Sequence, residues 1–330
     1  MNLLEQQAKN RRRTWMVMVV FIAFLFFLGY GFDLFYLGTN VPVAGFLAFL
    51  IGLCSALVGY YTGDRAVLAS SGAVSAGEML ASAADQDERL KITQLDNVVG
   101  EMAIAAGLPS PKVYVIPDHD PNAFATGRDP AHASIAVTRG LLDALNREEL
   151  QGVVAHEMSH VRNYDIRLMT LVAALVGAIA LLSDWALRGM RWGGGGSRRS
   201  GSRGKGGGAA VIFLVLWLIG ILLAPIIGQA LAMLVSRRRE YLADASGAEL
   251  TRNPLALAKA LEKIEFAADP TESIKQGTAN LCIADPLGRK AGLREGVVAD
   301  LFASHPPMVK RIAALREMAY AGPAPQIHAD

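Results

Sequence analysis

Cysteine is the scarcest chemically useful residue in this sequence. Only two cysteines occur among the 330 residues, Cys54 and Cys282, and Cys54 lies inside an apolar run. Two such cysteines cannot form a disulfide framework or a zinc site built from cysteine clusters. Any bound metal ion must therefore be held by His, Asp or Glu side chains.

A charge excess of either sign is also missing. The chain has 32 Lys and Arg residues against 30 Asp and Glu residues, which gives a formal net charge of +2. Nucleic-acid binding usually requires a strong basic excess. We therefore expect no nucleic-acid partner.

Apolar residues are abundant instead, at 52% of the chain, and they are concentrated in four long runs. The runs extend over approximately Trp15–Leu37, Val41–Tyr61, Ile166–Leu187 and Ala209–Val235. A helix needs roughly 20 apolar residues to cross a hydrocarbon core about 30 Å thick. Because backbone polar groups must be hydrogen-bonded inside lipid, we predict four transmembrane helices.

Basic residues around the first two runs predict the orientation of the chain. Lys9 and Arg11–Arg13 precede the first run, whereas the link at Gly38–Asn40 contains no Lys or Arg. The positive-inside rule therefore places the N-terminus in the cytoplasm. A cleaved signal peptide is the less favoured alternative, because no small-x-small site follows the first run and the second run comes at once.

The link between the third and fourth runs opposes this orientation. It is rich in Gly, Ser and Arg from Gly193 to Gly208, a composition typical of a flexible linker. The positive-inside rule disfavours a basic link on the outer face. In contrast, Arg237–Arg239 after the fourth run favour the predicted orientation. Either the hairpin formed by the first two runs fixes the orientation, or the hairpin formed by the third and fourth runs enters the membrane only partly.

The stretch between the two hairpins has a mixed α and β pattern. Apolar residues at helical spacing over Glu88–Ala106 predict a helix, which Gly107-Leu108-Pro109 ends. Lys112–Ile116 and Ala133–Thr138 are short β-rich runs, and a second helix begins around Arg147. The C-terminal part reads as helical with a polar loop.

The second helix carries the sequence His156-Glu157-Met158-Ser159-His160. Residues four apart lie about 40° apart around a helix, so both imidazoles can bind one ion. Glu157 lies beside this pair, where it can reach a water molecule at the metal. Imidazole and carboxylate ligands favour zinc. A chance match on a polar helix face is the alternative explanation.

Glu240 and Asp244 form a second pair spaced four residues apart. Glu240 is a candidate third zinc ligand, and Asp244 a candidate hydrogen-bond acceptor for the distal nitrogen of His156. Taken alone, the pair is better explained as a solvated helix start. However, His160 lies shortly before the third run and Glu240 shortly after the fourth, so a membrane hairpin returns both to one surface.

Asp165 is a rival metal ligand. It lies nine residues beyond His156, but five residues past His160 it would occupy the wrong face of an unbroken helix.

Two weaker candidates complete the predicted site. His305 precedes Pro306-Pro307 and could stabilise a transition-state oxyanion, although a surface histidine is an equal alternative. Asn122, Ala123 and Phe124 begin a segment that, with Ala133–Thr138, could provide an edge strand for an extended substrate. An ordinary turn and strand is the simpler explanation of that segment.

These motifs resemble the HtpX-type integral-membrane zinc metalloproteases, relatives of the prenyl-protein (CAAX) endopeptidases. The resemblance covers two N-terminal apolar segments, His156-Glu157-x-x-His160, two further segments and Glu240-x-x-x-Asp244. Asn122–Gly127 and Ser304–Pro307 are similar to smaller family motifs. The basic, glycine-rich linker is a departure from the family pattern.

The resemblance implies a multi-pass protein of the bacterial inner membrane that binds one Zn2+ per chain. It further implies an endopeptidase that degrades misfolded or damaged membrane proteins at the cytoplasmic face. The expected fold is mainly α, with four transmembrane helices and a cytoplasmic zincin-like α+β domain. The expected parts are an N-terminal hairpin (1–62), a protease part (63–165), a second hairpin (166–238) and a helical C-terminal part (239–330).

Two other functions fit part of the sequence. A small transporter or channel could use the polar residues Asp33, Asp184 and Gln229 in or near the apolar runs, and would need neither zinc nor Glu157. A catalytically silent metal-binding scaffold would bind zinc yet tolerate the loss of Glu157.

Overall fold

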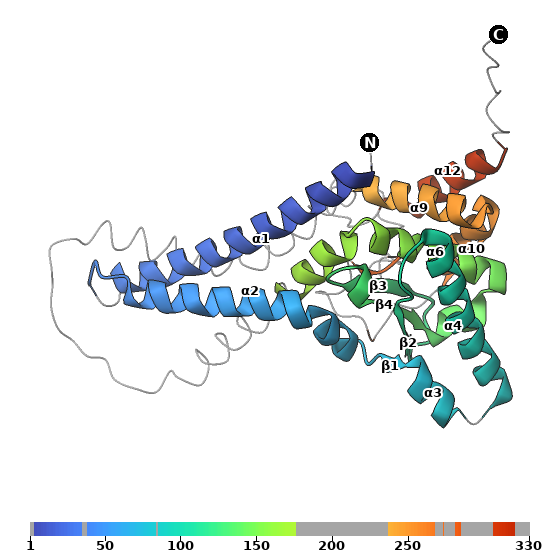
Figure 1. The fold of residues 1–330 in the computed structure, drawn as a ribbon, viewed down its shortest axis with the longest axis horizontal. Helices are drawn as coiled ribbons and strands as arrows, with labels where there is room; N and C mark the ends of the chain where they lie inside the picture. The colour runs from blue at the N-terminus through green and yellow to red at the C-terminus, as the bar shows by residue number, and fades with distance from the viewer. Residues whose placement is uncertain are drawn as a thin grey trace, which may run out of the picture.

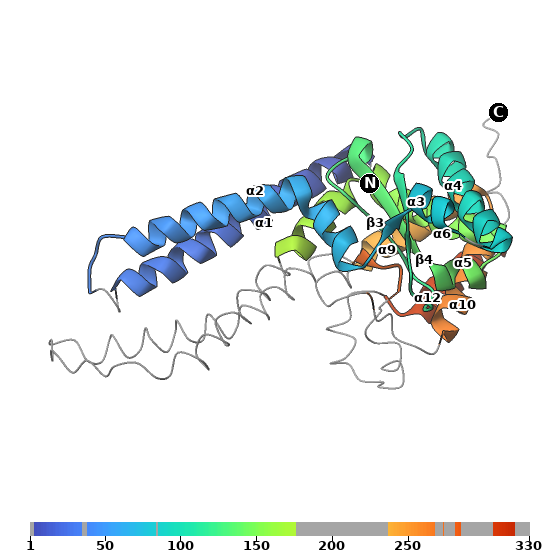
Figure 2. The ribbon, with the colours of Figure 1, turned by 90° about the horizontal axis from the view of Figure 1, so that it is seen from below.

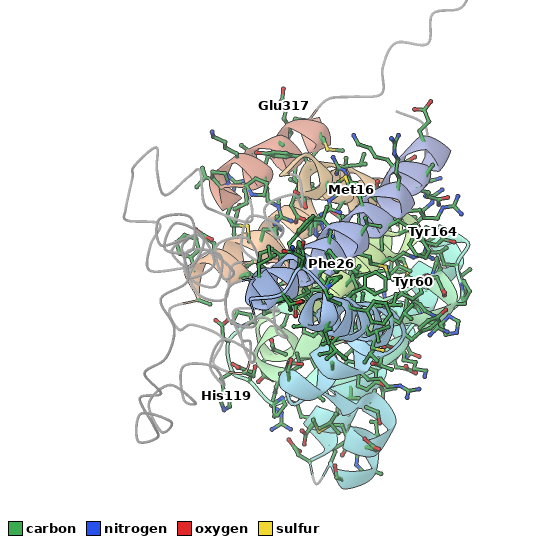
Figure 3. All side chains as sticks on the ribbon, turned by 90° about the vertical axis from the view of Figure 1, so that its left-hand side faces the viewer. Met16, Phe26, Tyr60, His119, Tyr164 and Glu317 are labelled. Atoms are coloured by element: carbon green, nitrogen blue, oxygen red, sulfur yellow. The ribbon has the colours of Figure 1, made fainter. Side chains whose placement is uncertain are left out.

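A computed structural model describes residues 3–34, 38–83, 85–175, 237–267, 273, 281–284 and 306–320. Helices α1 (Leu3–Phe32) and α2 (Val43–Ser70) form a long hairpin that projects from the remainder of the chain (Figures 1 and 2). Figure 3 views the molecule from the hairpin side, with Met16 and Phe26 on α1 and Tyr60 on α2. The remainder is mainly helical around one small mixed sheet.

Two helices among the described residues are long and apolar enough to cross a membrane, over Gln7–Gly31 and Val43–Ser70. They correspond to the first two predicted segments. Of the third predicted segment, residues 166–175 are helical, and the rest of it lies outside the described residues, as does the fourth. Asp184, Gln229 and the glycine-rich linker also lie outside them.

Close packing and one buried carboxylate hold the hairpin together at its far end. A Cβ added at Gly29 would lie 2.4 Å from the Ala44 carbonyl oxygen, so the two helices approach there at a distance that only glycine allows. Asp33 is buried, and its two carboxylate oxygens accept hydrogen bonds from the backbone N–H groups of Ala44 and Gly45. Asp33 thus satisfies donors in the first turn of α2, which gives it a structural role.

The sheet contains four strands in the order β1-β2-β4-β3. The strands are β1 (Val74–Ser75), β2 (Lys112–Ile116), β3 (Ala123–Gly127) and β4 (Ala133–Thr138). β2 and β4 run parallel, whereas β1 pairs with β2 and β3 with β4 in antiparallel orientation. β3 is therefore an edge strand, as the substrate-binding hypothesis requires.

Short helices join or flank these strands. They are α3 (Ala76–Ser82), the 3-10 turn η2 (Pro130–His132) and α5 (Arg139–Ala144). The longer α4 (Gln86–Ala106) ends at Gly107, whose φ of 66° places it in the left-handed region that glycine favours. This is the end that the Gly107-Leu108-Pro109 sequence predicts.

Helix α6 (Arg147–Arg162) is the centre of the fold. A capping box between Asn146 and Glu149 begins it, and every residue from Gly152 to Val161 is buried. It lies against β3 and β4 and also packs against α4, α9 (Arg237–Thr251) and α10 (Pro254–Phe266). The last described helix, α12 (Met308–Tyr320), packs on α10 and α9.

Helix α9 approaches α6 unusually closely because of one glycine. A Cβ added at Gly247 would lie 3.0 Å from the backbone nitrogen of His156 and 3.2 Å from its Cα. With a glycine there, the backbones of α6 and α9 can come close enough for short carboxylate side chains on α9 to reach the histidines.

Candidate active site

The two histidines of α6 and one glutamate of α9 form a buried cluster. His156, His160 and Glu240 each offer a ligand atom, and these atoms lie within 4.8 Å of one another. Glu240 Oε2 is 3.6 Å from His156 Nε2, and Glu240 Oε1 is 3.7 Å from His160 Nε2. All three side chains are at most 4% exposed.

The donor set fits a zinc ion. Donors about 2.0–2.1 Å from a tetrahedral ion lie roughly 3.4 Å from one another, close to the spacing found here. His156 Nε2 is buried and makes no hydrogen bond to any described residue. Because buried polar atoms normally have partners, this nitrogen is more consistent with a ligand atom than with a structural group.

The second ring nitrogen of His156, Nδ1, contacts a network of charged side chains. This nitrogen lies 2.9 Å from Asp244 Oδ1, the contact expected from the sequence. Burial by itself would lower the pKa of His156, but its interactions with Asp244 and Glu240 outweigh burial and raise the pKa to about 9. A metal ion bound at Nε2 would replace the proton that this environment favours.

Asp244 is in turn fixed by Arg311 of α12. Arg311 Nε donates to Asp244 Oδ2 at 2.8 Å, and Nη2 donates to Oδ1 at 2.7 Å. Burial would raise the pKa of Asp244, but the guanidinium group outweighs it and lowers the pKa to about 2. This bidentate pair is wholly buried, so Asp244 stays ionised and has one orientation.

Arg311 also ties three parts of the site together. Its Nη1 donates to the Ile283 carbonyl oxygen at 2.8 Å and lies 3.8 Å from Glu240 Oε2. Sequence reasoning did not identify Arg311. A signal for it exists, since Met308, Arg311 and Leu315 share the apolar spacing of the buried face of α12.

Asp165 contacts Nδ1 of His160, as Asp244 contacts Nδ1 of His156. Asp165 Oδ2 lies 3.1 Å from His160 Nδ1. The expectation that Asp165 occupies the wrong face of the helix is wrong, because the helix does not continue. α6 ends at Arg162, and Tyr164 adopts a φ of 59°, which turns the chain so that Asp165 folds back toward His160.

Glu157 stands apart from these networks. Both carboxylate oxygens are buried and form no hydrogen bond to the described residues. Burial raises the pKa of Glu157 above its ordinary value, while His156 and His160 act in the opposite direction and Glu240 adds to the rise. A weaker interaction with the Ala125 backbone amide also favours the charged form. Such a carboxylate is suited to accepting a proton at neutral pH.

The edge strand β3 is partly covered. The Ile283 backbone N–H donates to the Ala123 carbonyl oxygen at 2.9 Å, and Cys282 pairs with Phe124 in an antiparallel bridge. Asn122 is buried, and its side-chain amide donates to the Ala284 carbonyl oxygen at 3.3 Å. The Phe124 side chain is fully buried among residues that include Val67, Met169 and Cys282.

The other two described histidines, His119 and His132, are not part of this cluster. His305 and His328 lie outside the described residues, whereas His119 and His132 are exposed. Figure 3 shows His119 well away from the α1–α2 hairpin.

Comparisons with known proteins agree with this geometry. The sequence profile of peptidase family M48 matches residues 89–319, a range that contains every residue of the cluster. A "Protease HtpX homolog" of Caldanaerobacter subterraneus subsp. tengcongensis is 45% identical over 316 residues, covering 96% of this chain and 98% of its own. Proteins of the same description from Lactiplantibacillus plantarum and Streptococcus gordonii are 42% and 41% identical, each matched over its whole length.

One solved structure, titled "Crystal Structure of S. mikatae Ste24p", aligns with a TM-score of 0.46 at 17% identity. The alignment covers 94% of this chain and 67% of that chain. Given the extent of the family match and the identity to full-length relatives, the chain belongs to peptidase family M48, as an HtpX-type membrane zinc metalloprotease.

Proposed function

We propose that this chain is an endopeptidase of the bacterial inner membrane that hydrolyses peptide bonds of misfolded or damaged membrane proteins at the cytoplasmic face. The observation that carries the proposal is the buried cluster of His156, His160 and Glu240, next in sequence to Glu157, whose carboxylate forms no hydrogen bond within the part of the chain that the structure describes. The relatives described as "Protease HtpX homolog" support proteolysis, and the substrate class is what the resemblance to HtpX-type proteases implies.

The orientation is supported by contacts at the start of α1. Asn10 of α1 contacts Asp165, so the cluster lies at the N-terminal end of this helix. The same end carries Lys9, Arg11 and Arg12, which are all exposed. Basic residues flanking a membrane helix favour the cytoplasmic side, which puts the catalytic site there as well.

In this proposal His156, His160 and Glu240 hold one Zn2+, and Asp244 fixes the tautomer and orientation of His156. When bound, zinc supplies Lewis acidity, which polarises a peptide carbonyl and makes water more acidic. Bidentate pairing with Arg311 keeps Asp244 charged, and a charged partner strengthens the basicity of the imidazole.

Glu157 acts as the general base and then as the general acid. Its carboxylate accepts a proton from the attacking water and afterwards transfers that proton to the leaving amine. The raised pKa of this buried carboxyl allows it to hold the proton between the two steps. Neither oxygen forms a hydrogen bond to the described residues, so both are available for this work.

Substrate binding is assigned to the segment of β3 that begins at Asn122, Ala123 and Phe124. The Ala123 carbonyl oxygen faces outward, since it accepts from Ile283, and alternation along the strand makes Ala125 the next outward-facing residue. The Ala125 backbone amide is near enough to Glu157 to favour the charged form of its carboxyl and so lower its pKa. An extended substrate that pairs with β3 at this level lies next to the catalytic carboxylate.

His305 is proposed to stabilise the oxyanion of the transition state. It precedes Pro306 and Pro307, and α12 begins directly after them at Met308. The helix that follows His305 in the sequence also carries Arg311.

Purified Glu157→Gln protein tests the proposal. The variant should retain zinc, because Glu157 is not among the ligands, and should lose casein cleavage by about 10²–10⁴-fold. Cleavage at the wild-type rate with zinc bound would show that Glu157 is not the base and would favour a metal-binding scaffold. Wild-type protein without zinc would contradict the metal site itself.

A further inference from the structure

We propose that Asn10, on the first membrane helix, is a positioning residue for the zinc ligand His160 and acts through Asp165. The inference rests on the proposed function, because it takes His160 to be a ligand. It gives α1 a part in the active site in addition to its part in membrane attachment.

The environment of Asn10 is the first observation. Asn10 is only 2% exposed, although its neighbours Lys9 and Arg11 are exposed. It continues a buried stripe along α1 that includes Thr14, Val17 and Phe21. Farther along the stripe, Val17 and Phe21 pack in one apolar cluster with Leu168, Leu171 and Leu175. This packing holds α1 against the chain that follows α6.

The hydrogen bonds of Asn10 are the second observation. Its side-chain amide nitrogen donates to Asp165 Oδ1 at 2.6 Å and to the Asn163 carbonyl oxygen at 2.9 Å. Both N–H bonds of the amide are therefore used, which fixes the orientation of the side chain. Asn163 and Asp165 flank Tyr164, the residue with a left-handed backbone, so Asn10 also braces the turn that redirects Asp165.

The two oxygens of Asp165 have different partners. Oδ1 accepts from Asn10 and, at 3.2 Å, from Arg239 Nη1 of α9, whereas Oδ2 lies 3.1 Å from His160 Nδ1. Donors on Oδ1 prevent the carboxylate from rotating away from the imidazole. His160 is thereby held as the tautomer that donates from Nδ1 and presents the lone pair of Nε2 toward Glu240.

Gln7 provides a matched control on the same helix. It lies one turn before Asn10, and its side-chain amide donates to the Arg162 carbonyl oxygen at 2.9 Å. Gln7 therefore joins α1 to the end of α6 as Asn10 does, but it does not contact Asp165. A variant at Gln7 reports on helix docking alone.

The experiment compares Asn10→Ala, Asn10→Asp and Gln7→Ala in full-length protein purified in detergent. The first measurement is the rate of zinc release to a chromogenic chelator. Loss of a partner of a metal-bound histidine costs about 10–100-fold in metal affinity, and Asn10 acts one bond farther out, so about tenfold faster release is expected for Asn10→Ala. Asn10→Asp keeps the size of the side chain and places a second carboxylate against Asp165, so its release should be at least as fast.

The second measurement is the visible absorption spectrum of the Co2+-substituted protein, which reports ligand geometry independently of catalysis. Both Asn10 variants should change this spectrum, and Gln7→Ala should leave it, and zinc release, within about twofold of wild type. If Asn10→Ala does not fold, the isosteric Asn10→Asp carries the comparison.

Two outcomes would overturn the role of Asn10. One is wild-type zinc release and a wild-type cobalt spectrum in both Asn10 variants. The other is an equal effect of Gln7→Ala, because that would trace the change to docking of α1 in general. Wild-type protein that binds no zinc would instead overturn the proposed function, so the two failures are distinguishable.

Discussion

The two metal-site histidines are supported in different ways. His156 is held by Asp244, which forms a buried bidentate ion pair with Arg311, and both partners lie on helices outside the membrane hairpin. His160 is held by Asp165, whose other oxygen accepts from Asn10 of the membrane helix α1 and from Arg239. One ligand is thus fixed by the body of the protease, and the other depends in part on the hairpin.

The two sides of the metal site differ in how much free energy a rearrangement would cost. An ion pair that is fully buried resists rearrangement, because removing either partner leaves an uncompensated charge. An amide donor at the end of a long hairpin can shift with that hairpin at a smaller cost. The His156 side therefore depends on the packing of α6, α9 and α12, whereas the geometry of the His160 side also depends on the docking of α1.

The largest expected effect comes from breaking the His156 side at Arg311. Arg311→Met removes the bidentate partner of the buried Asp244, although the contact with His156 remains, and should lower the free energy of unfolding by about 3–5 kcal/mol. Chemical denaturation of the zinc-free protein measures this. The double variant Asp244→Leu with Arg311→Met should recover much of the loss, since it removes both charges. Equal destabilisation of the single and double variants would refute the pairing argument.

Replacing each carboxylate that contacts a ligand histidine tests the difference between the two sides of the metal site. Asp165→Ala and Asp244→Ala should each weaken zinc binding by about 10–100-fold, because each removes a carboxylate from a ligand histidine. Asp244→Ala should also destabilise the zinc-free fold more than Asp165→Ala, because it removes both hydrogen bonds of the bidentate pair with Arg311, whereas Arg239 makes one hydrogen bond to Asp165. Competition with a chelator gives the affinities, and denaturation gives the stabilities. Matching stability losses would remove the distinction between the two sides.

The pH dependence of zinc binding tests the His156 side alone. Its pKa of about 9 in the metal-free protein means that the imidazole is protonated at neutral pH. Zinc must displace that proton, so apparent affinity should rise about tenfold per pH unit between pH 6 and 8. Calorimetry in buffers of different ionisation enthalpy should detect release of about one proton. Affinity that is flat over this range would show that His156 is already neutral.

The smallest predicted effect concerns the spacing between α6 and α9. Gly247→Ala places a methyl group 3.0 Å from the His156 backbone nitrogen, so α9 must move by a few tenths of an ångström. We expect a loss of about 1 kcal/mol in stability and a measurable rise in zinc release. Gly100→Ala is the control, because a Cβ there meets nothing within 4 Å, and it should be neutral or stabilising. Similar behaviour of the two variants would contradict the role of Gly247.

Local features of the fold were accessible from the sequence. Lys112–Ile116 and Ala133–Thr138 are strands with the predicted bounds, and α6 begins at the predicted Arg147. Each depends on a short pattern of β-branched residues or a capping sequence that acts within a few residues. The meeting of His156, His160 and Glu240 could also be predicted, because a membrane hairpin expected between His160 and Glu240 would return the chain to the same surface.

Two other contacts between residues far apart in the sequence could not be predicted from it. Arg311 is 67 residues from Asp244, and Asn10 is 155 residues from Asp165, so no local pattern joins either pair. Asp165 was misjudged for another reason. The left-handed backbone at Tyr164 breaks the helix, and no glycine marks this turn in the sequence.

The distance along the chain between Asn10 and Arg311 has a consequence for biosynthesis. Translation proceeds from the N-terminus, so Asn10 is made before Arg311. Until α12 is made, Asp244 lacks its arginine and His156 lacks a fixed orientation. A nascent chain that has not been extended through α12 therefore has an incomplete support for the metal site, which we expect to limit proteolysis while the chain is being made.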